Sequence, residues 1–94
     1  MENTHELYER FFVQEVTNMA RERGLSHSEF GRRLFGEEGS RMWRTVRDPM
    51  NTRKPRRVSL GEVHKVAEIL DVELPSLIWA ISQKFDAEQK LRKE

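Results

Sequence analysis

The sequence of 94 residues contains no cysteine. This absence excludes disulfide bonds, thiolate zinc sites, iron–sulfur clusters and cysteine nucleophiles. Three prolines and five glycines are too few for a collagen-like or low-complexity chain. No apolar run approaches the roughly 18 residues of a membrane span, and the first residues lack the basic and apolar stretches of a secretion signal. We therefore expect one small cytoplasmic domain with no membrane partner.

Positive charge is concentrated in one stretch, although the formal net charge of the whole chain is only +1. Residues 32–57 contain nine basic and three acidic residues, and the rest of the chain is net acidic. Eight of the nine basic residues are arginine, whose planar guanidinium suits phosphates and guanine edges. Few acids accompany them, so a face that binds a polyanion is favoured over a surface of internal ion pairs.

The apolar residues recur with the period of a helix, and no segment alternates as a strand does. The pattern predicts five helices, at about residues 4–23, 26–35, 37–47, 59–70 and 73–85. Ser26 with Glu29, and Ser59 with Glu62, have the spacing of capping boxes at the starts of the second and fourth helices. The charged residues 86–94 are expected to fray.

The apolar stripes of the five predicted helices can share one core. Leu60 in the fourth helix, and Ile78 and Phe85 in the fifth, are expected to face it. Trp43 shares an apolar stripe with Met42 and Val46, so we expect it in the core rather than stacked on a base. Gly31 lies inside the second helix, where glycine costs about 1 kcal/mol relative to alanine. A close crossing with another helix would explain it.

The second and third predicted helices are short, are joined by a glycine-containing turn, and carry arginines opposite the apolar side of the third. This is the layout of a helix-turn-helix, whose second helix enters the DNA major groove. The chain resembles the Cro/lambda-repressor-like (Xre-type) helix-turn-helix family over about residues 25–78. The resemblance rests on Leu25-Ser26-His27-Ser28-Glu29-Phe30-Gly31-Arg32-Arg33-Leu34, on Ser40-Arg41-Met42-Trp43-Arg44-Thr45-Val46, and on Val58-Ser59-Leu60 through Ile69-Leu70-Asp71-Val72. It implies an all-α, compact five-helix lambda-repressor-like DNA-binding domain.

The chain departs from the family pattern at four places. His27 replaces the usual glutamine, which touches phosphate and braces the recognition helix, and Gly31 replaces the usual alanine. The span from Leu34 to Trp43 is about two residues longer than the family turn, and the loop before Ser59 is longer and more basic. These departures affect which residues reach the bases, because they move the start of the recognition helix.

The resemblance implies that the helix at about residues 38–47 reads DNA bases. By position, the candidate base contacts are Ser40, Arg41, Arg44, Thr45 and Arg47. The candidate phosphate contacts are His27, Ser28, Arg32, Arg33, Arg53, Lys54, Arg56 and Arg57. We therefore expect a sequence-specific double-stranded DNA-binding transcriptional regulator of the phage-repressor type, with no cofactor, no metal and no catalytic residue.

Trp79 lies on the flank of the inward stripe of the fifth helix. It could form an exposed apolar patch with Phe85 or Leu91 that drives self-association, or it could pack on the first helix beneath Tyr8 or Val13. Family members commonly dimerise through their C-terminal helices, so the resemblance implies a homodimer with Trp79 and Phe85 at its interface.

Three other functions are less well supported by the sequence. The first alternative is an antitoxin-like or adaptor module that uses the same fold to bind a toxin-like protein partner. RNA binding ranks below it, because only Phe35 and Trp43 are aromatic within the basic stretch at residues 32–57. Enzyme activity ranks last, because no catalytic set or phosphate loop is visible and His5, His27 and His64 lack metal-ligand spacing.

Overall fold

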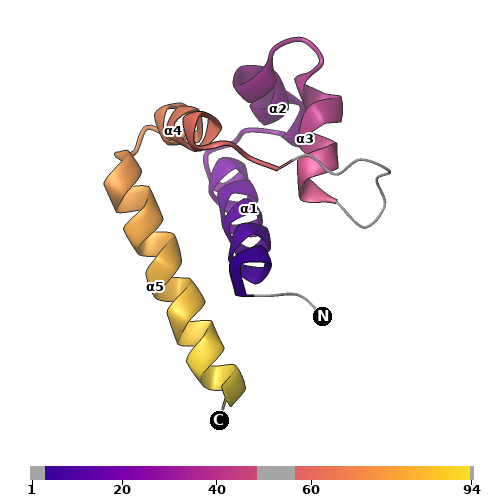
Figure 1. The fold of residues 1–94 in the computed structure, drawn as a ribbon. Coiled ribbons are helices and arrows are strands. Elements are labelled where there is room, and N and C mark those ends of the chain that lie inside the picture. The colour runs from indigo at the N-terminus through magenta and orange to yellow at the C-terminus, as the bar shows by residue number, and fades with distance from the viewer. Residues whose placement is uncertain (1–3, 49–56, 94) are drawn as a thin grey trace.

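The computed structural model describes residues 4–48 and 57–93 of the chain. These residues form five helices and no strand: α1 (Thr4–Glu22), α2 (His27–Phe35), α3 (Gly39–Arg47), α4 (Leu60–Ile69) and α5 (Leu74–Lys93). The two long helices, α1 and α5, run side by side in opposite directions, and the α2–α3 pair lies on the other side of α1 (Figure 1). The prediction of a compact all-α domain with five helices is confirmed. None of the described helices is both long enough and apolar enough to span a membrane.

Side-chain caps fix the starts of α2 and α4. The Ser59 hydroxyl accepts from the Glu62 amide at 3.2 Å, and the Glu62 carboxylate accepts from the Ser59 amide at 2.8 Å, which completes the predicted capping box. At α2, the Ser26 hydroxyl accepts from the Glu29 amide at 3.1 Å. The Glu29 carboxylate instead accepts from Arg33 at 3.0 Å, so only the Ser26 half of that predicted box is present.

The C-terminal ends of α1 and α4 have the same backbone geometry with different residues at the left-handed position. In α1 this position is Gly24, with φ of 77°, and in α4 it is Asp71, with φ of 57°. Each end has the two hydrogen bonds of a Schellman motif. In α4 the amides of Asp71 and Val72 donate to the carbonyls of Glu68 and Ala67 at 3.1 and 3.0 Å.

The core draws side chains from all five helices. Its buried apolar members are Phe12, Val16, Ala20, Phe30, Leu34, Trp43, Val46, Val66, Ala67, Leu70, Leu77, Ile81 and Phe85. Trp43 is only 2% exposed and packs on Phe30 with ring centroids 4.9 Å apart, which confirms its predicted place in the core.

Two residues expected in the core are exposed instead. Leu60 is 77% exposed because it is the first residue of α4, one turn before Val63, where the packed stripe of this helix begins. Ile78 is 36% exposed because Leu77 and Ile81 already occupy the inward stripe of α5. Its position, about 100° around the helix from Leu77, falls at the edge of that stripe.

Helix α5 continues to Lys93 and so includes residues 86–93 of the charged tail, for which fraying stays a prediction. Two interactions support this extension. Phe85 is buried against α1, with its ring centroid 5.1 Å from that of Tyr8. Arg92 and Glu88, one turn apart, form an ion pair at 3.5 Å. The Tyr8 hydroxyl also lies 2.7 Å from Ser82 Oγ, so polar and aromatic contacts together join α1 to α5.

Candidate nucleic-acid interface

Helices α2 and α3 meet through their backbones at two glycines. A Cβ atom added to Gly31 would lie 2.5 Å from the carbonyl oxygen of Gly39, and one added to Gly39 would overlap the carbonyl group of Gly31. No side chain can fit between them. The expectation that Gly31 permits a close helix crossing is therefore confirmed, and this contact sets the angle at which α3 projects from the domain.

The outward side of α3 carries arginine, and its inward side is apolar. Trp43 and Val46 are buried, whereas Arg41 and Arg44 are exposed. Neither Arg41 nor Arg44 forms an ion pair or hydrogen bond with another residue that the structure describes. The Thr45 hydroxyl is half-buried and donates to the Met42 carbonyl at 2.7 Å. Of the candidate base contacts, the side chains of Arg41 and Arg44 therefore have the most freedom to reach a ligand.

A polar network joins the start of α2 to α3. The Nε2 atom of His27 lies 3.1 Å from the carbonyl oxygen of Ser40, and the hydroxyls of Ser28 and Ser40 are 3.2 Å apart. Arg47 Nη1 lies 2.6 Å from His27 Nδ1. His27 and Ser28 were expected to contact phosphates, and Ser40 and Arg47 were expected to contact bases. The structure joins these four residues in one connected cluster. His27 links both ends of α3 to α2.

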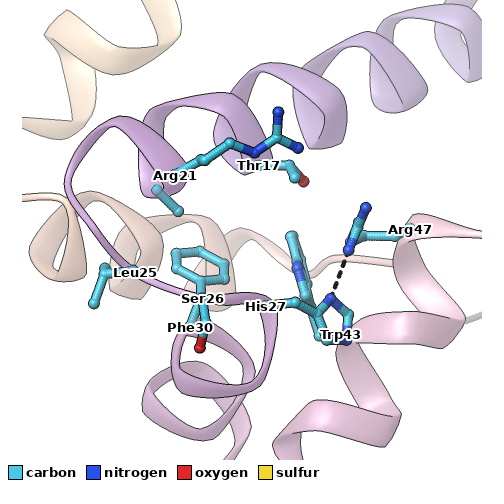
Figure 2. A pocket seen from close by; sticks show the side chains of 9 residues that line it. Thr17, Arg21, Leu25, Ser26, His27, Phe30, Trp43 and Arg47 are labelled. Carbon is cyan, nitrogen blue, oxygen red and sulfur yellow. Dashed lines mark hydrogen bonds between the residues drawn. The ribbon is translucent and has the colours of Figure 1, made fainter.

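A small cavity of about 130 Å³ lies beside this network. Its lining comes from α1, α2, α3 and the turn before α2, and consists of Thr17, Ala20, Arg21, Leu25, Ser26, His27, Phe30, Trp43 and Arg47. Figure 2 shows Arg21 lying along α1 beside Thr17, and Arg47 of α3 projecting into the region between the helices, where it is joined to His27. Two of the nine lining residues are arginines and none is a carboxylate, so the lining carries net positive charge.

Sequence reasoning missed Arg21 as a member of this site. Arg21 lies in the last turn of α1, outside the basic stretch at residues 32–57. The feature that could have identified it is the reversal at Gly24, which brings the last turn of α1 beside Ser26 at the start of α2. Arg21 is exposed and has no ion pair with another described residue.

Among the remaining phosphate candidates, those that the structure describes are not gathered at one place. Arg32 is exposed on α2, and Arg33 is paired with Glu29 at 3.0 Å. Arg57 is paired with Glu9 of α1 at 2.9 Å. Glu9 and the cavity residue Arg21 are separated along α1 by about 18 Å of helix rise, so Arg57 is remote from the cavity. Arg53, Lys54 and Arg56 lie outside the described residues.

The two residues predicted for a dimer interface differ in exposure. Trp79 is 67% exposed on the outward side of α5, which contradicts the alternative in which it packs beneath Tyr8. Phe85 is only 6% exposed and packs edge-on against Tyr8 and Phe11. Its assignment to an exposed patch was therefore wrong, because the turn of α5 that carries it faces α1. Leu91, farther along, is 73% exposed.

The resemblance to the Cro/lambda-repressor-like family rests on the residues quoted for it and stays a prediction. Comparison with protein-family models, with curated proteins and with solved structures found no match in any of the three.

Proposed function

We propose that this protein is a sequence-specific double-stranded DNA-binding transcriptional regulator that reads the major groove with α3. One observation carries the proposal: α3 exposes Arg41 and Arg44 with no ion pair to a described residue, while the buried Trp43 holds the opposite side of the helix. Arginines without an ion pair among the described residues, on the exposed side of a firmly packed helix, suit a polyanion whose base edges accept hydrogen bonds.

The positions of the cationic residues support a division between base and phosphate contacts. Arg41 and Arg44 lie on the outward side of α3, where a helix in the major groove presents side chains to base edges. Arg47, His27 and Arg21 lie at the cavity beside α3, where they suit a phosphate of the DNA backbone. A bidentate arginine contact with guanine contributes about 1–3 kcal/mol of discrimination, so we expect guanines in the recognised sequence.

Selection from a pool of random DNA duplexes tests this function. We expect the wild type to enrich a defined sequence, and Arg41→Ala or Arg44→Ala to lose preference at one base position while affinity for unrelated DNA changes little. The matched control is Arg92→Ala on α5, whose guanidinium pairs with Glu88. Failure of the wild type to enrich any sequence at low salt contradicts the proposal. Uniform weakening in the α3 variants assigns those arginines to phosphate contacts.

The proposal includes a homodimer that uses the outward side of α5. Trp79 provides a large exposed apolar surface there, and interfaces are enriched in such aromatic residues. A two-fold dimer would place two copies of α3 about 34 Å apart, one turn of DNA. The exposed Trp79 also suits the alternative, an antitoxin-like or adaptor module bound to a protein partner, and the oligomeric state of the purified chain distinguishes the two.

A further inference from the structure

The imidazole of His27 makes two hydrogen bonds that fix the position of its hydrogen. Nε2 faces the Ser40 carbonyl at 3.1 Å, and a carbonyl only accepts, so Nε2 carries the hydrogen. Nδ1 faces Arg47 Nη1 at 2.6 Å, and a guanidinium only donates, so Nδ1 is the bare acceptor. This arrangement requires a neutral imidazole, because a hydrogen on Nδ1 would point at the donor group of Arg47.

The side chains that line the cavity with His27 are cationic or neutral. From α1, Arg21 and the Thr17 hydroxyl share the cavity with it, and from α3, Arg47 and the buried Trp43 do so. The nine lining residues include no carboxylate and no second imidazole. The cavity of about 130 Å³ is well below the roughly 300 Å³ of the smallest usual organic-ligand pockets. Its size and charge therefore suit a phosphate group.

We propose that this cavity binds one phosphodiester group of the DNA backbone and that binding adds a proton to Nδ1 of His27. The inference rests on the proposed function and specifies how that site is regulated. Phosphate oxygens only accept hydrogen bonds, so they repel the bare Nδ1 and attract the Arg47 guanidinium away from it. A protonated Nδ1 donates to the phosphate, while Nε2 still donates to Ser40. The proton comes from solvent, up to one for each chain.

Proton uptake makes DNA affinity depend on pH. The complex binds more protons than the free protein, so affinity falls as pH rises, by at most about tenfold per pH unit for each chain. Imidazoles as a class change charge between about pH 5 and pH 8, so this is the range in which affinity is compared. Arg21 and Arg47 stay charged throughout this range. They therefore add affinity without adding pH dependence.

Two histidine variants isolate this effect in the full chain. In His27→Gln the amide nitrogen can donate to the Ser40 carbonyl and the amide oxygen can accept from Arg47, but the side chain does not titrate. The matched control is His64→Gln, because His64 lies on the surface of α4 beside Glu68 and does not line the cavity. Affinity for a labelled random-sequence DNA duplex is measured by fluorescence anisotropy at low, constant salt from about pH 5.5 to about pH 8.5.

The inference predicts that the wild type and His64→Gln share a decline in affinity with rising pH, and that His27→Gln lacks most of it. Equal declines in all three proteins overturn the inference and leave the proposed function standing. Failure of all three to bind the duplex at any pH overturns the proposed function itself.

Calorimetry provides a readout that needs no variant. Titration of wild-type protein with the duplex near neutral pH, in two buffers of different ionisation enthalpy, gives the number of protons taken up. We expect each chain to take up between zero and one proton on binding the duplex. No uptake, or proton release, overturns the inference even if His27→Gln does not fold.

Discussion

The side chain of Arg23 donates from Nε to the backbone carbonyl of Leu70 at 2.9 Å, across 47 residues of sequence. Arg23 also donates from Nη1 to the Met19 carbonyl of α1 at 3.3 Å, and that carbonyl accepts from the Arg23 amide as well, at 3.2 Å. One guanidinium therefore donates to carbonyls at the C-terminal ends of both α1 and α4. The contact holds α4 against the end of α1 that borders the cavity.

Arg23→Ala is expected to lower the free energy of unfolding by about 0.5–1.5 kcal/mol, because the Leu70 carbonyl loses its donor. Urea denaturation followed by circular dichroism measures the change. Arg92→Ala is the control, since Arg92 makes only an exposed ion pair at 3.5 Å within α5. Equal effects of the two substitutions would show that the link from Arg23 to Leu70 contributes nothing specific.

Asp71→Gly is expected to stabilise the protein. Asp71 adopts the left-handed conformation, with φ of 57°, and side chains with a Cβ pay about 1–2 kcal/mol for it, less for aspartate. Gly24→Ala at the equivalent place in α1 should destabilise, because alanine lacks the freedom that glycine has at φ of 77°. Thermal unfolding measures both effects: the melting temperature should rise in Asp71→Gly and fall in Gly24→Ala. A lower melting temperature for Asp71→Gly would indicate that the aspartate side chain itself supports this turn.

Gly31→Ala should disrupt the pairing of α2 and α3 and cost about 1–3 kcal/mol or more, because its Cβ would press on the Gly39 backbone. Gly61→Ala is a matched glycine substitution within a helix. Its Cβ would meet only Ser59 Oγ at 4.0 Å, and alanine favours helix, so we expect no loss of stability. Denaturation of both variants tests the difference, and equal stability of the two would argue against the observed crossing.

Lys84 should titrate above its ordinary pKa of 10.5, because its ammonium donates to the Glu15 carboxylate at 3.0 Å and that charge favours the protonated form. A raised pKa in the folded state means that the pair stabilises the fold below about pH 10.5 and that this contribution is lost as pH rises through the folded pKa. Lysine-selective NMR titration measures the pKa. In Glu15→Gln it should fall toward 10.5, and an unchanged value would assign the shift to another group.

Trp79→Ala should shift the protein toward monomer in sedimentation velocity, because it removes the largest exposed aromatic side chain of α5. Its stability should change little, since Trp79 is 67% exposed and lies outside the core. Leu60→Ala is the control, because Leu60 is a similarly exposed apolar residue on α4. A wild type that is monomeric at high concentration rejects the homodimer.

Local chemistry made much of the fold predictable from sequence. The spacing of Ser59 and Glu62 placed the start of α4, because a capping box involves only neighbouring residues. The cost of glycine inside a helix indicated a close contact at Gly31. The burial of Trp43 could be predicted from its place in an apolar stripe.

The rest could not be predicted because it depends on where distant segments meet. Nothing near Arg23 in the sequence indicates the Leu70 carbonyl as its partner. The link between His27 and Arg47 likewise depends on the angle between α2 and α3. Periodicity identified the inward stripe of the fifth helix. It could not decide whether Phe85 belongs to that stripe or to an exposed apolar patch, because the answer depends on how far α5 extends along α1.

The crossing at Gly31 and Gly39 separates the geometry of α3 from its outward chemistry. Two main chains set the helix angle, and Trp43 and Val46 secure it from inside. None of these groups is on the side where Arg41 and Arg44 project. Descendants of this chain could therefore exchange the outward residues and acquire a new target without rebuilding the domain that presents them.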